Sequence, residues 1–342
     1  MDNARKIRLA VVGCGAVARI HHLPSITASN RFELIALVDR YLPNAQKLGE
    51  EYGIPAAVED YGEIAAHIDA AIVALPNYLH ATVSIDLLQR GIHVLVEKPM
   101  ALSSRECETM ISAASDAGAV LAVGMDFRFI RAFQFVQQVL DQGLLGDIIS
   151  FDIRQGVILN WAVSSDYLLK KDKAGGGVLF DFGPHILDLM LWWFGDYERV
   201  EYYDDAAGGI EANCELHLMM QSGVSGTVEL SRMRTLSNTC TIRGSKGILE
   251  VGIWDHNPRV QLNIAGSDLG LDGTITSSGK PDRHFRDVFC RQLDDFADAM
   301  LYRREPFIPG REGKRCIALI EACYASKKFL RYAWDSPTMQ SV

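Results

Sequence analysis

Short β-rich runs alternate with helix-like segments through the first 125 residues, and no other feature limits the possible folds so strongly. The runs cover residues 7–12, 32–38, 70–75, 92–96 and 120–123, and the segments between them include 45–52, 81–89 and 104–117. Such alternation indicates a parallel sheet with helices on both faces. The runs are almost continuously apolar, as buried parallel strands are. The sequence therefore predicts a doubly wound α/β domain over residues 1–125.

The pattern changes in residues 126–342. The β-rich runs now cover residues 148–154, 199–203, 211–220, 226–231, 239–243 and 248–251, and helix-like segments cover 133–140, 284–301 and 312–330. Serine and glycine turns, without long helices, separate the β-rich runs, which is typical of an antiparallel sheet. We expect a second domain with a mostly antiparallel sheet, and an exposed loop in the polar, glycine-rich stretch 266–280.

Composition excludes several classes of protein. The chain has 342 residues, of which 48% are hydrophobic, so it can bury a core, and its length fits roughly two domains. No apolar run is long enough to cross a bilayer, so we expect no membrane partner. The 43 acidic residues outnumber the 34 basic ones, which argues against a nucleic-acid partner and fits a small-molecule ligand.

Seven cysteines occur without a C-x-x-C pair, at wide spacings, which argues against a disulfide framework and a structural zinc site and favours free thiols.

Basic residues precede the apolar stretch 9–12, and Ala16-Val17-Ala18 resembles a signal-peptidase site. Gly13 and Gly15 interrupt that stretch, however. We interpret the segment as mature protein and expect a cytoplasmic location.

The first candidate site is a glycine-rich loop. Gly13-Cys14-Gly15-Ala16-Val17-Ala18 is a G-x-G-x-x-A that follows a predicted strand and opens a helix. Its glycines permit a tight turn and close approach of a pyrophosphate, as in a Rossmann dinucleotide site. Asp39 ends the next strand and suits a ribose 2′-hydroxyl, which favours NAD. Arg40 beside it could bind a 2′-phosphate, so NADP is not excluded as the cofactor.

Two further motifs carry polar side chains suited to chemistry. Lys98, in Glu97-Lys98-Pro99, ends a predicted strand, where a ligand of an open parallel sheet would lie, and it can stabilise negative charge on a substrate oxygen. Asp181 and His185 are four residues apart and His185 and Asp188 three apart, so a helix would place them on one face. A carboxylate beside an imidazole suits proton transfer near neutral pH.

Together these motifs resemble those of the glucose–fructose oxidoreductase/inositol dehydrogenase (Gfo/Idh/MocA) family. The resemblance covers nearly the whole chain and includes G-x-G-x-x-A, His22-Leu23-Pro24, Pro76-Asn77-Tyr78-Leu79-His80, Glu97-Lys98-Pro99 and G-G-G-x-x-x-D-x-G-x-H-x-x-D at 175–188. It implies a Rossmann domain followed by an α/β domain with a large, open sheet, and homodimers or homotetramers formed through the outer face of that sheet. It also implies NAD(P)-dependent hydride transfer between nicotinamide and a secondary hydroxyl or ketone of a sugar, inositol or related polyol.

The resemblance also implies residue roles. Lys98, Asp181 and His185 would be catalytic, with His185 taking the hydroxyl proton, Lys98 binding the same oxygen, and Asp181 orienting His185 or binding a neighbouring hydroxyl. The residues expected at the cofactor are Gly13, Gly15, Ala16, Val17, Asp39, Arg40, Leu75, Pro76, Asn77, His80, Glu97 and Lys98. One position departs from the family pattern, since Asp126 stands where an asparagine is common. No metal is expected.

The substrate and the net reaction stay open. Candidate substrate residues are Asn160 and Trp161, and also Tyr167, Arg154 and His256, because aromatic and amide side chains suit a sugar. Two alternatives to a dehydrogenase or reductase are a redox-neutral glycosidase or epimerase that retains NAD, and a dinucleotide-binding regulator without catalysis. A regulator does not require Lys98, Asp181 and His185 together, so their joint presence favours an enzyme.

Overall fold

The computed structural model describes residues 5–158, 166–267, 270–277 and 280–330. The N-terminal part forms a six-stranded parallel sheet in the order β3-β2-β1-β4-β5-β6. Its strands are β1 (Ile7–Val12), β2 (Phe32–Val38), β3 (Ala56–Val58), β4 (Ala70–Val73), β5 (His93–Glu97) and β6 (Leu121–Gly124). This confirms the predicted doubly wound sheet. The edge strand β3 was not predicted, because three residues carry no readable pattern.

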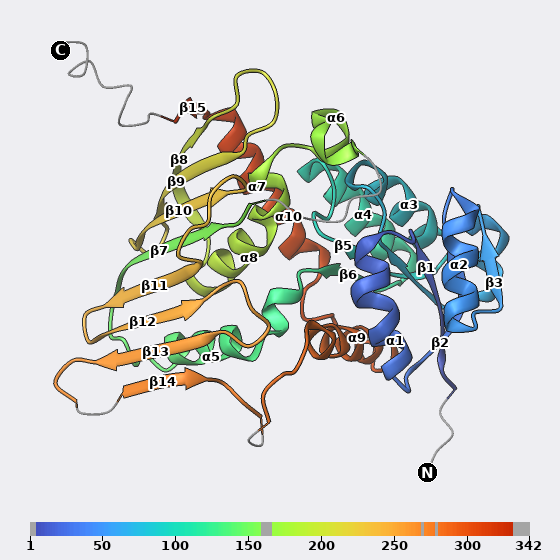
Figure 1. The fold of residues 1–342 in the computed structure, drawn as a ribbon, viewed down its shortest axis with the longest axis horizontal. Helices are drawn as coiled ribbons and strands as arrows, with labels where there is room; N and C mark the ends of the chain where they lie inside the picture. Colours follow the sequence, from blue (N-terminus) through green and yellow to red (C-terminus); the bar gives the residue numbers. More distant parts are fainter. Residues whose placement is uncertain (1–4, 159–165, 268–269, 278–279, 331–342) are drawn as a thin grey trace.

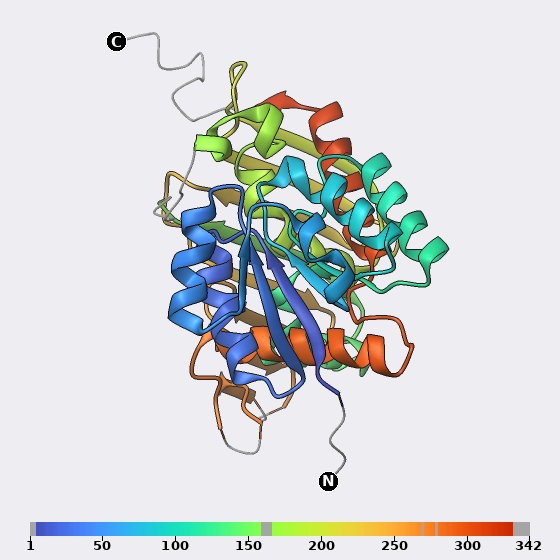
Figure 2. The same cartoon turned by 90° about the vertical axis from the view of Figure 1, so that its right-hand side faces the viewer.

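Helices cover both faces of this sheet. They are α1 (Leu23–Ala28), α2 (Leu42–Tyr52), α3 (Asn77–Gln89) and α4 (Ser104–Ala117), joined from the C-terminal part by α9 (Phe285–Leu301) and α10 (Gly310–Ala325). Figure 2 shows α9, in orange, crossing beside the strands close to α1. Leu293, Phe296 and Ala297 of α9 share a core with Leu9 and Val11 of β1. The N-terminal sheet is thus completed by a helix from the far end of the sequence, and a domain boundary near residue 125 stays a prediction.

The second sheet has nine strands in the order β14-β13-β12-β11-β7-β10-β9-β8-β15 (Figure 1). Its strands are β7 (Ile148–Gly156), β8 (Tyr197–Asp204), β9 (Asn213–Met220), β10 (Ser225–Ser231), β11 (Thr239–Gly244), β12 (Gly247–Gly252), β13 (Arg259–Ile264), β14 (Gly270–Thr274) and β15 (Lys328–Phe329). Neighbouring strands are antiparallel, except that β7 with β10 and β8 with β15 run parallel. The sheet is mostly antiparallel, as predicted.

Two predictions at the edges of this sheet were wrong. The stretch 266–280 contains β14, which pairs with β13 and places Asp272 against Arg259. The segment 312–330 is not one helix, because α10 ends at Ala325 and Lys328–Phe329 pair with β8. Both edge strands are short and largely exposed, so they lack the apolar alternation that predicts a strand.

The nine-stranded sheet has one packed face and one open face. Along β7, Phe151 and Ile153 are buried, whereas Asp152 and Arg154, which alternate with them, point to the other side. The helices α5 (Arg131–Asp141), α7 (Val178–Asp181) and α8 (Gly183–Phe194) lie on the packed side, which faces the six-stranded sheet (Figure 1). The short helix α6 (Lys171–Ala174) lies beside α3. The open face has no described helix over it.

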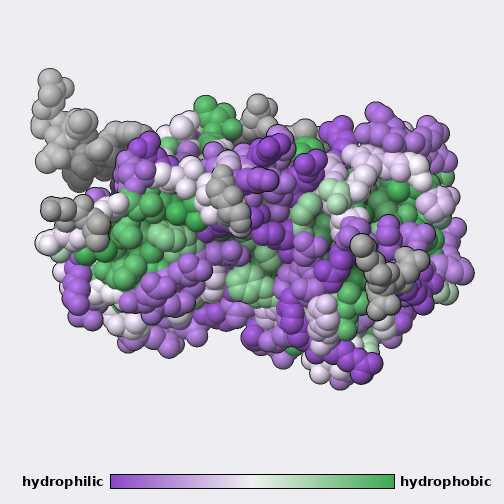
Figure 3. Space-filling model, turned by 90° about the horizontal axis from the view of Figure 1, so that it is seen from below, coloured by the Kyte–Doolittle hydropathy of each residue, from purple (hydrophilic) through white to green (hydrophobic). Residues whose placement is uncertain are grey.

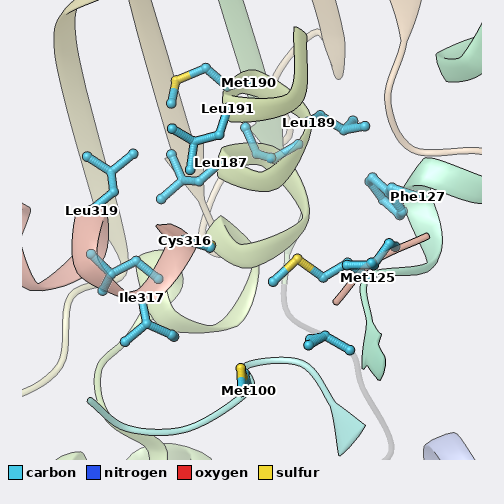
Figure 4. Close-up of a cluster of buried hydrophobic side chains, with 14 of the residues drawn as sticks. Met100, Met125, Phe127, Leu187, Leu189, Met190, Leu191, Cys316, Ile317 and Leu319 are labelled. Atoms are coloured by element: carbon cyan, nitrogen blue, oxygen red, sulfur yellow. The ribbon is translucent and has the colours of Figure 1, made fainter. Parts of the chain in front are cut away.

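A continuous apolar core joins the two sheets. Figure 4 shows Met100, Met125 and Phe127 from the six-stranded side near Leu187 of α8 and Ile317 of α10. Close packing is required here, because a Cβ on Gly313 of α10 would lie 2.7 Å from the Met100 sulfur. The helices α8 and α10 therefore hold the two sheets together directly behind the catalytic candidates.

The surface is mainly polar, and its features fit the composition. The face in Figure 3 is mostly hydrophilic, with separate hydrophobic patches. Of the described helices, none is long and apolar enough to span a membrane. All seven cysteines are free, and only Cys290 is not buried, which confirms the free-thiol interpretation.

Candidate active site

The glycine-rich loop has the shape that a dinucleotide requires. Gly13 has φ +102°, and a Cβ there would lie 2.7 Å from the carbonyl carbon of Ala74 and closer still to its oxygen. Only glycine fits such a position. A Cβ on Gly15, in contrast, would meet nothing within 4 Å, so open space lies in front of this backbone. The tight turn and the open space fit the approach of a pyrophosphate.

Asp39 lies beside this loop, at the end of β2. Its Oδ2 accepts a hydrogen bond from the Cys14 N–H at 3.0 Å, and its Oδ1 accepts one from the Tyr41 N–H at 2.9 Å. These two bonds fix the carboxylate next to the loop. The neighbouring Arg40 is exposed. The residues present therefore fit an adenine dinucleotide, with a carboxylate fixed beside the loop.

Lys98 and Asp181 meet where β5 ends and α7 ends. Lys98 Nζ donates to the backbone oxygen of Asp181 at 2.9 Å and lies 3.4 Å from its Oδ1. The other carboxylate oxygen, Oδ2, accepts a hydrogen bond from Arg232 Nη2 at 3.0 Å. The side chains of Lys98 and Asp181 are each about one fifth exposed. The structure thus brings two of the three predicted catalytic residues together and adds a second cation.

The expected partnership of Asp181 with His185 was wrong. His185 Nδ1 lies 3.2 Å from Asp126 Oδ1, close enough for an ion pair although not aligned as a hydrogen bond. The imidazole stacks on Phe127 with a centroid separation of 4.4 Å. The segment divides into α7 and α8 at Phe182, but this residue keeps helical angles (φ −84°, ψ −34°). The partner of His185 is therefore decided by Asp126, which approaches from another segment. Asp188, the other predicted neighbour, binds Arg128.

The electrostatics favour a charged Asp126. Burial alone would raise the pKa of Asp126, but the nearby imidazole of His185 and other positive groups outweigh it, and the pKa is lowered. An ionised carboxylate beside His185 stabilises an imidazolium. Asp126 therefore lies beside the imidazole of His185, where Asp181 was expected.

Glu97 is held by hydrogen bonds from His22 and from the Lys98 backbone. His22, at the end of a π-helical turn (Ala18–His22) that follows the glycine-rich loop, places Nε2 2.6 Å from Glu97 Oε1. Glu97 Oε2 accepts the Lys98 backbone N–H at 3.2 Å. Burial acts to raise the pKa of Glu97, yet the hydrogen bond with His22 and its charge prevail, and the pKa is lowered. This chain of contacts links the glycine-rich loop to the turn that carries Lys98.

Other predicted cofactor residues hold the loops in place. Asn77 Nδ2 donates to the Ala174 carbonyl at 2.8 Å and so connects α3 to the glycine-rich segment before α7. The two ring nitrogens of His80 lie 2.7 Å from the carbonyl oxygens of Leu75 and Pro99. His80 is 1% exposed, so in this structure it ties together two loops at the ends of β4 and β5.

The substrate candidates have four different outcomes. Asn160 and Trp161 lie outside the described residues. Arg154 projects from the open face of the sheet toward Asp152 and Glu229, away from Lys98, so its assignment to the substrate was wrong. Tyr167 lies near the site: burial, with the charges of Asp181 and Glu97, raises its pKa to about 12. His256 packs against Phe285 at 5.4 Å between ring centroids.

Two features of the site escaped the sequence analysis. Arg232 follows β10 and reaches Asp181 across 51 positions, and His22 belongs to a quoted motif but had no assigned role. No sequence spacing signals such long-range pairs. Within the described parts of the chain, no group of three or more histidine, cysteine, aspartate or glutamate side chains is arranged to hold a metal ion.

Comparison with known proteins gives consistent matches over most of the chain. Residues 7–125 match the model "Oxidoreductase family, NAD-binding Rossmann fold", and residues 133–250 match "GFO/IDH/MocA C-terminal domain". The dTDP-3,4-didehydro-2,6-dideoxy-alpha-D-glucose 3-reductase of Actinomadura kijaniata is 29% identical over 94% of this chain and 95% of its own. The scyllo-inositol 2-dehydrogenase (NAD(+)) of Bacillus subtilis is 24% identical over 89% of each chain. The aldose-aldose oxidoreductase of Caulobacter crescentus superposes with a TM-score of 0.84 at 25% identity, covering 94% of this chain and 97% of that one.

Proposed function

The chain belongs to the Gfo/Idh/MocA family of oxidoreductases with an NAD-binding Rossmann fold, and from this premise we propose that it transfers a hydride between nicotinamide and a secondary hydroxyl or ketone of a sugar or polyol at Lys98 and His185. The observation that carries the proposal is the presence of two pairs, Lys98 with Asp181 and His185 with Asp126, with the Lys98 charge also acting on Asp126. Relatives named for inositol oxidation and keto-sugar reduction support the substrate class.

Gly13, Gly15, Ala16 and Val17 would hold the pyrophosphate, and Asp39 would hold the adenosine ribose. Glu97, Lys98 and the loop of Leu75, Pro76 and Asn77 would surround the nicotinamide half. When bound, NAD supplies the hydride acceptor and its reduced form the hydride donor. A carboxylate at Asp39 repels a 2′-phosphate, which supports NAD over NADP. The preference is tested by titrating the protein with NADH and NADPH separately.

His185 accepts the substrate proton, and Lys98 stabilises the charge on the substrate oxygen. The substrate hydroxyl gives its proton to His185, whose imidazolium is stabilised by the ionised Asp126 at 3.2 Å. The Lys98 ammonium donates to the same oxygen and stabilises the negative charge that develops there. Phe127, stacked on the imidazole, holds the ring in a fixed orientation. Asp181 keeps the Lys98 ammonium in place and offers an acceptor to a second hydroxyl.

The open face of the nine-stranded sheet supports assembly into homodimers or homotetramers. No described helix covers this face, and Ile248 is exposed on it, as are the charged side chains of Asp152, Arg154 and Glu229. Light scattering of the purified protein measures its oligomeric state directly. A monomer at micromolar concentration would contradict this part of the proposal.

The seven free thiols support a reducing, cytoplasmic location, which cell fractionation tests.

A substrate screen tests the proposed activity. Purified protein is given NAD or NADP with a panel of aldoses, inositols, alkyl glucosides and nucleotide-linked sugars, and reduced nicotinamide is followed by its near-ultraviolet absorbance. The reverse direction is followed with NADH and keto-sugars. We expect turnover of at least one sugar or polyol, and its loss in Lys98→Ala and His185→Ala. Full activity in both variants would refute the assigned site.

A further inference from the structure

Arg232 is a buried cation to which the proposed mechanism gives no task. Its side chain is 6% exposed, and Nη2 donates to Asp181 Oδ2 at 3.0 Å. Its Nε and Nη1 are shielded from solvent and have no hydrogen-bond partner among the described residues. A buried guanidinium is costly unless it is paired. Within the described structure, the carboxylate of Asp181 is therefore what compensates its charge.

The backbone around Arg232 is fixed. Its own N–H donates to the Ala212 carbonyl at 3.0 Å. Ser231, just before it, accepts hydrogen bonds from the N–H groups of Met233 and Arg234 at 3.1 and 2.9 Å. The guanidinium thus projects from a rigid turn at the end of β10, and a planar, directional donor on a rigid base fixes whatever it binds.

The two oxygens of the Asp181 carboxylate are engaged differently. Oδ2 takes the 3.0 Å hydrogen bond from Arg232, whereas Oδ1 lies 3.4 Å from Lys98 Nζ. The Lys98 ammonium donates its shorter hydrogen bond, at 2.9 Å, to the Asp181 backbone oxygen. Oδ1 therefore remains the oxygen with spare accepting capacity, and it lies next to a lysine that has spare N–H groups.

Resting on the proposed function, we propose that Arg232 is a positioning residue for the reaction: it holds Asp181 so that Oδ1 accepts a hydrogen bond from the substrate hydroxyl next to the reacting carbon. Lys98 binds the reacting oxygen, and Asp181 binds its neighbour. A donor and an acceptor side by side match two adjacent oxygens. The substrate is thus a vicinal diol on a sugar or polyol, or the α-hydroxyketone formed from it.

Kinetics with a matched pair of substrates test this role. The pair consists of a substrate found in the screen and its analogue lacking one hydroxyl next to the oxidised carbon. For the parent protein we expect kcat/KM to be about tenfold or more lower for the analogue, as for a lost hydrogen bond to a charged group. In Arg232→Met this preference should shrink toward one, because Asp181 is no longer held. Arg232→Lys should retain part of it, and the exposed Arg234→Met, on the same turn, should retain all of it.

Two outcomes of these kinetics would contradict the proposals, and they differ from each other. If Arg232→Met lowers kcat/KM by the same factor for both substrates, the arginine has only a structural role and the inference is overturned. If the parent protein turns over no sugar or polyol, the proposed function fails instead, so the two failures are distinguishable.

A thermal unfolding cycle decides the Arg232–Asp181 contact without any substrate. Asp181→Asn leaves a buried guanidinium without its charge partner, so its unfolding midpoint should fall. The double variant Asp181→Asn/Arg232→Met removes that unpaired charge, and its midpoint should lie above that of Asp181→Asn alone. If the two substitutions simply add, the guanidinium does not depend on Asp181, and the inference is again overturned.

Discussion

Replacing Gly13 by alanine should damage folding and cofactor binding together. The added methyl would lie 2.7 Å from the Ala74 carbonyl carbon and 3.2 Å from Leu75 Cδ2, where ordinary contacts are 3.4–4 Å. The overlap is with backbone, which no rotamer change relieves. A positive φ in a residue with a Cβ costs about 1–2 kcal/mol, and overpacking costs about 1–3 kcal/mol. The free energy of unfolding should therefore fall by about 2–5 kcal/mol.

Gly15→Ala is the matched control. Its methyl would meet nothing within 4 Å, so the free energy of unfolding should stay within about 0.5 kcal/mol of the parent value. The methyl occupies the space that a pyrophosphate needs, however, so NADH binding should still be lost. Denaturant unfolding followed by circular dichroism, with NADH fluorescence titration of both variants, separates the two effects. Parent-like stability of Gly13→Ala, or parent-like NADH affinity of Gly15→Ala, would refute this account of the loop.

Three further predictions concern other parts of the molecule. Asp126→Asn should lower kcat by about tenfold or more while NADH affinity is unchanged, because the His185 imidazolium loses its counter-charge; an unchanged kcat with any substrate would rule out this partnership. Burial acts to raise the pKa of Asp282, but hydrogen bonds from Arg291 and Arg131 lower it; its stabilisation is therefore present above the pKa of an unfolded aspartate, about 3.9, and lost as pH falls through the lower folded value. Asp282→Asn should thus cost about 2 kcal/mol at neutral pH and progressively less below about pH 4, and a pH-independent difference in unfolding free energy would contradict this. Burial raises the pKa of Cys14 and Cys107 to about 12; with six of the seven thiols buried, at most one should react quickly with a thiol reagent before denaturation, and several fast thiols in the native protein would contradict the packing.

The local features of the fold are readable from the sequence. The helix α4 spans 104–117 as predicted, because Ser103 and Glu106 form a capping box and Gly118 ends the helix in a left-handed conformation. The glycine-rich loop and Asp39 are likewise local, since each directly follows a strand that is almost continuously apolar. Such signals involve residues only a few positions apart.

The pairing inside the site is not local, and the prediction from residue spacing was wrong there. The four-residue spacing of Asp181 and His185 suggests a pair, and Phe182 between them keeps helical angles, but residues from other segments contact both side chains. His185 instead meets Asp126, and Asp181 meets Arg232. The first contact depends on how α8 packs against the segment after β6, and the second on how α7 packs against the end of β10. Asp126 was noticed only as a departure from the family pattern, and its physical role emerges from the folded structure.

Hydride transfer by the parent protein and by Lys98→Met tests the central claim most directly. Both proteins are saturated with NAD, after binding is verified by titration, and a single turnover of each sugar or polyol of the panel is followed by the absorbance of reduced nicotinamide. We expect the parent protein to reduce NAD with at least one of them. We expect Lys98→Met, once saturated with cofactor, to be slower by about a hundredfold or more. Bound NAD that no member of the panel reduces, or a Lys98→Met protein as fast as the parent, would contradict the account.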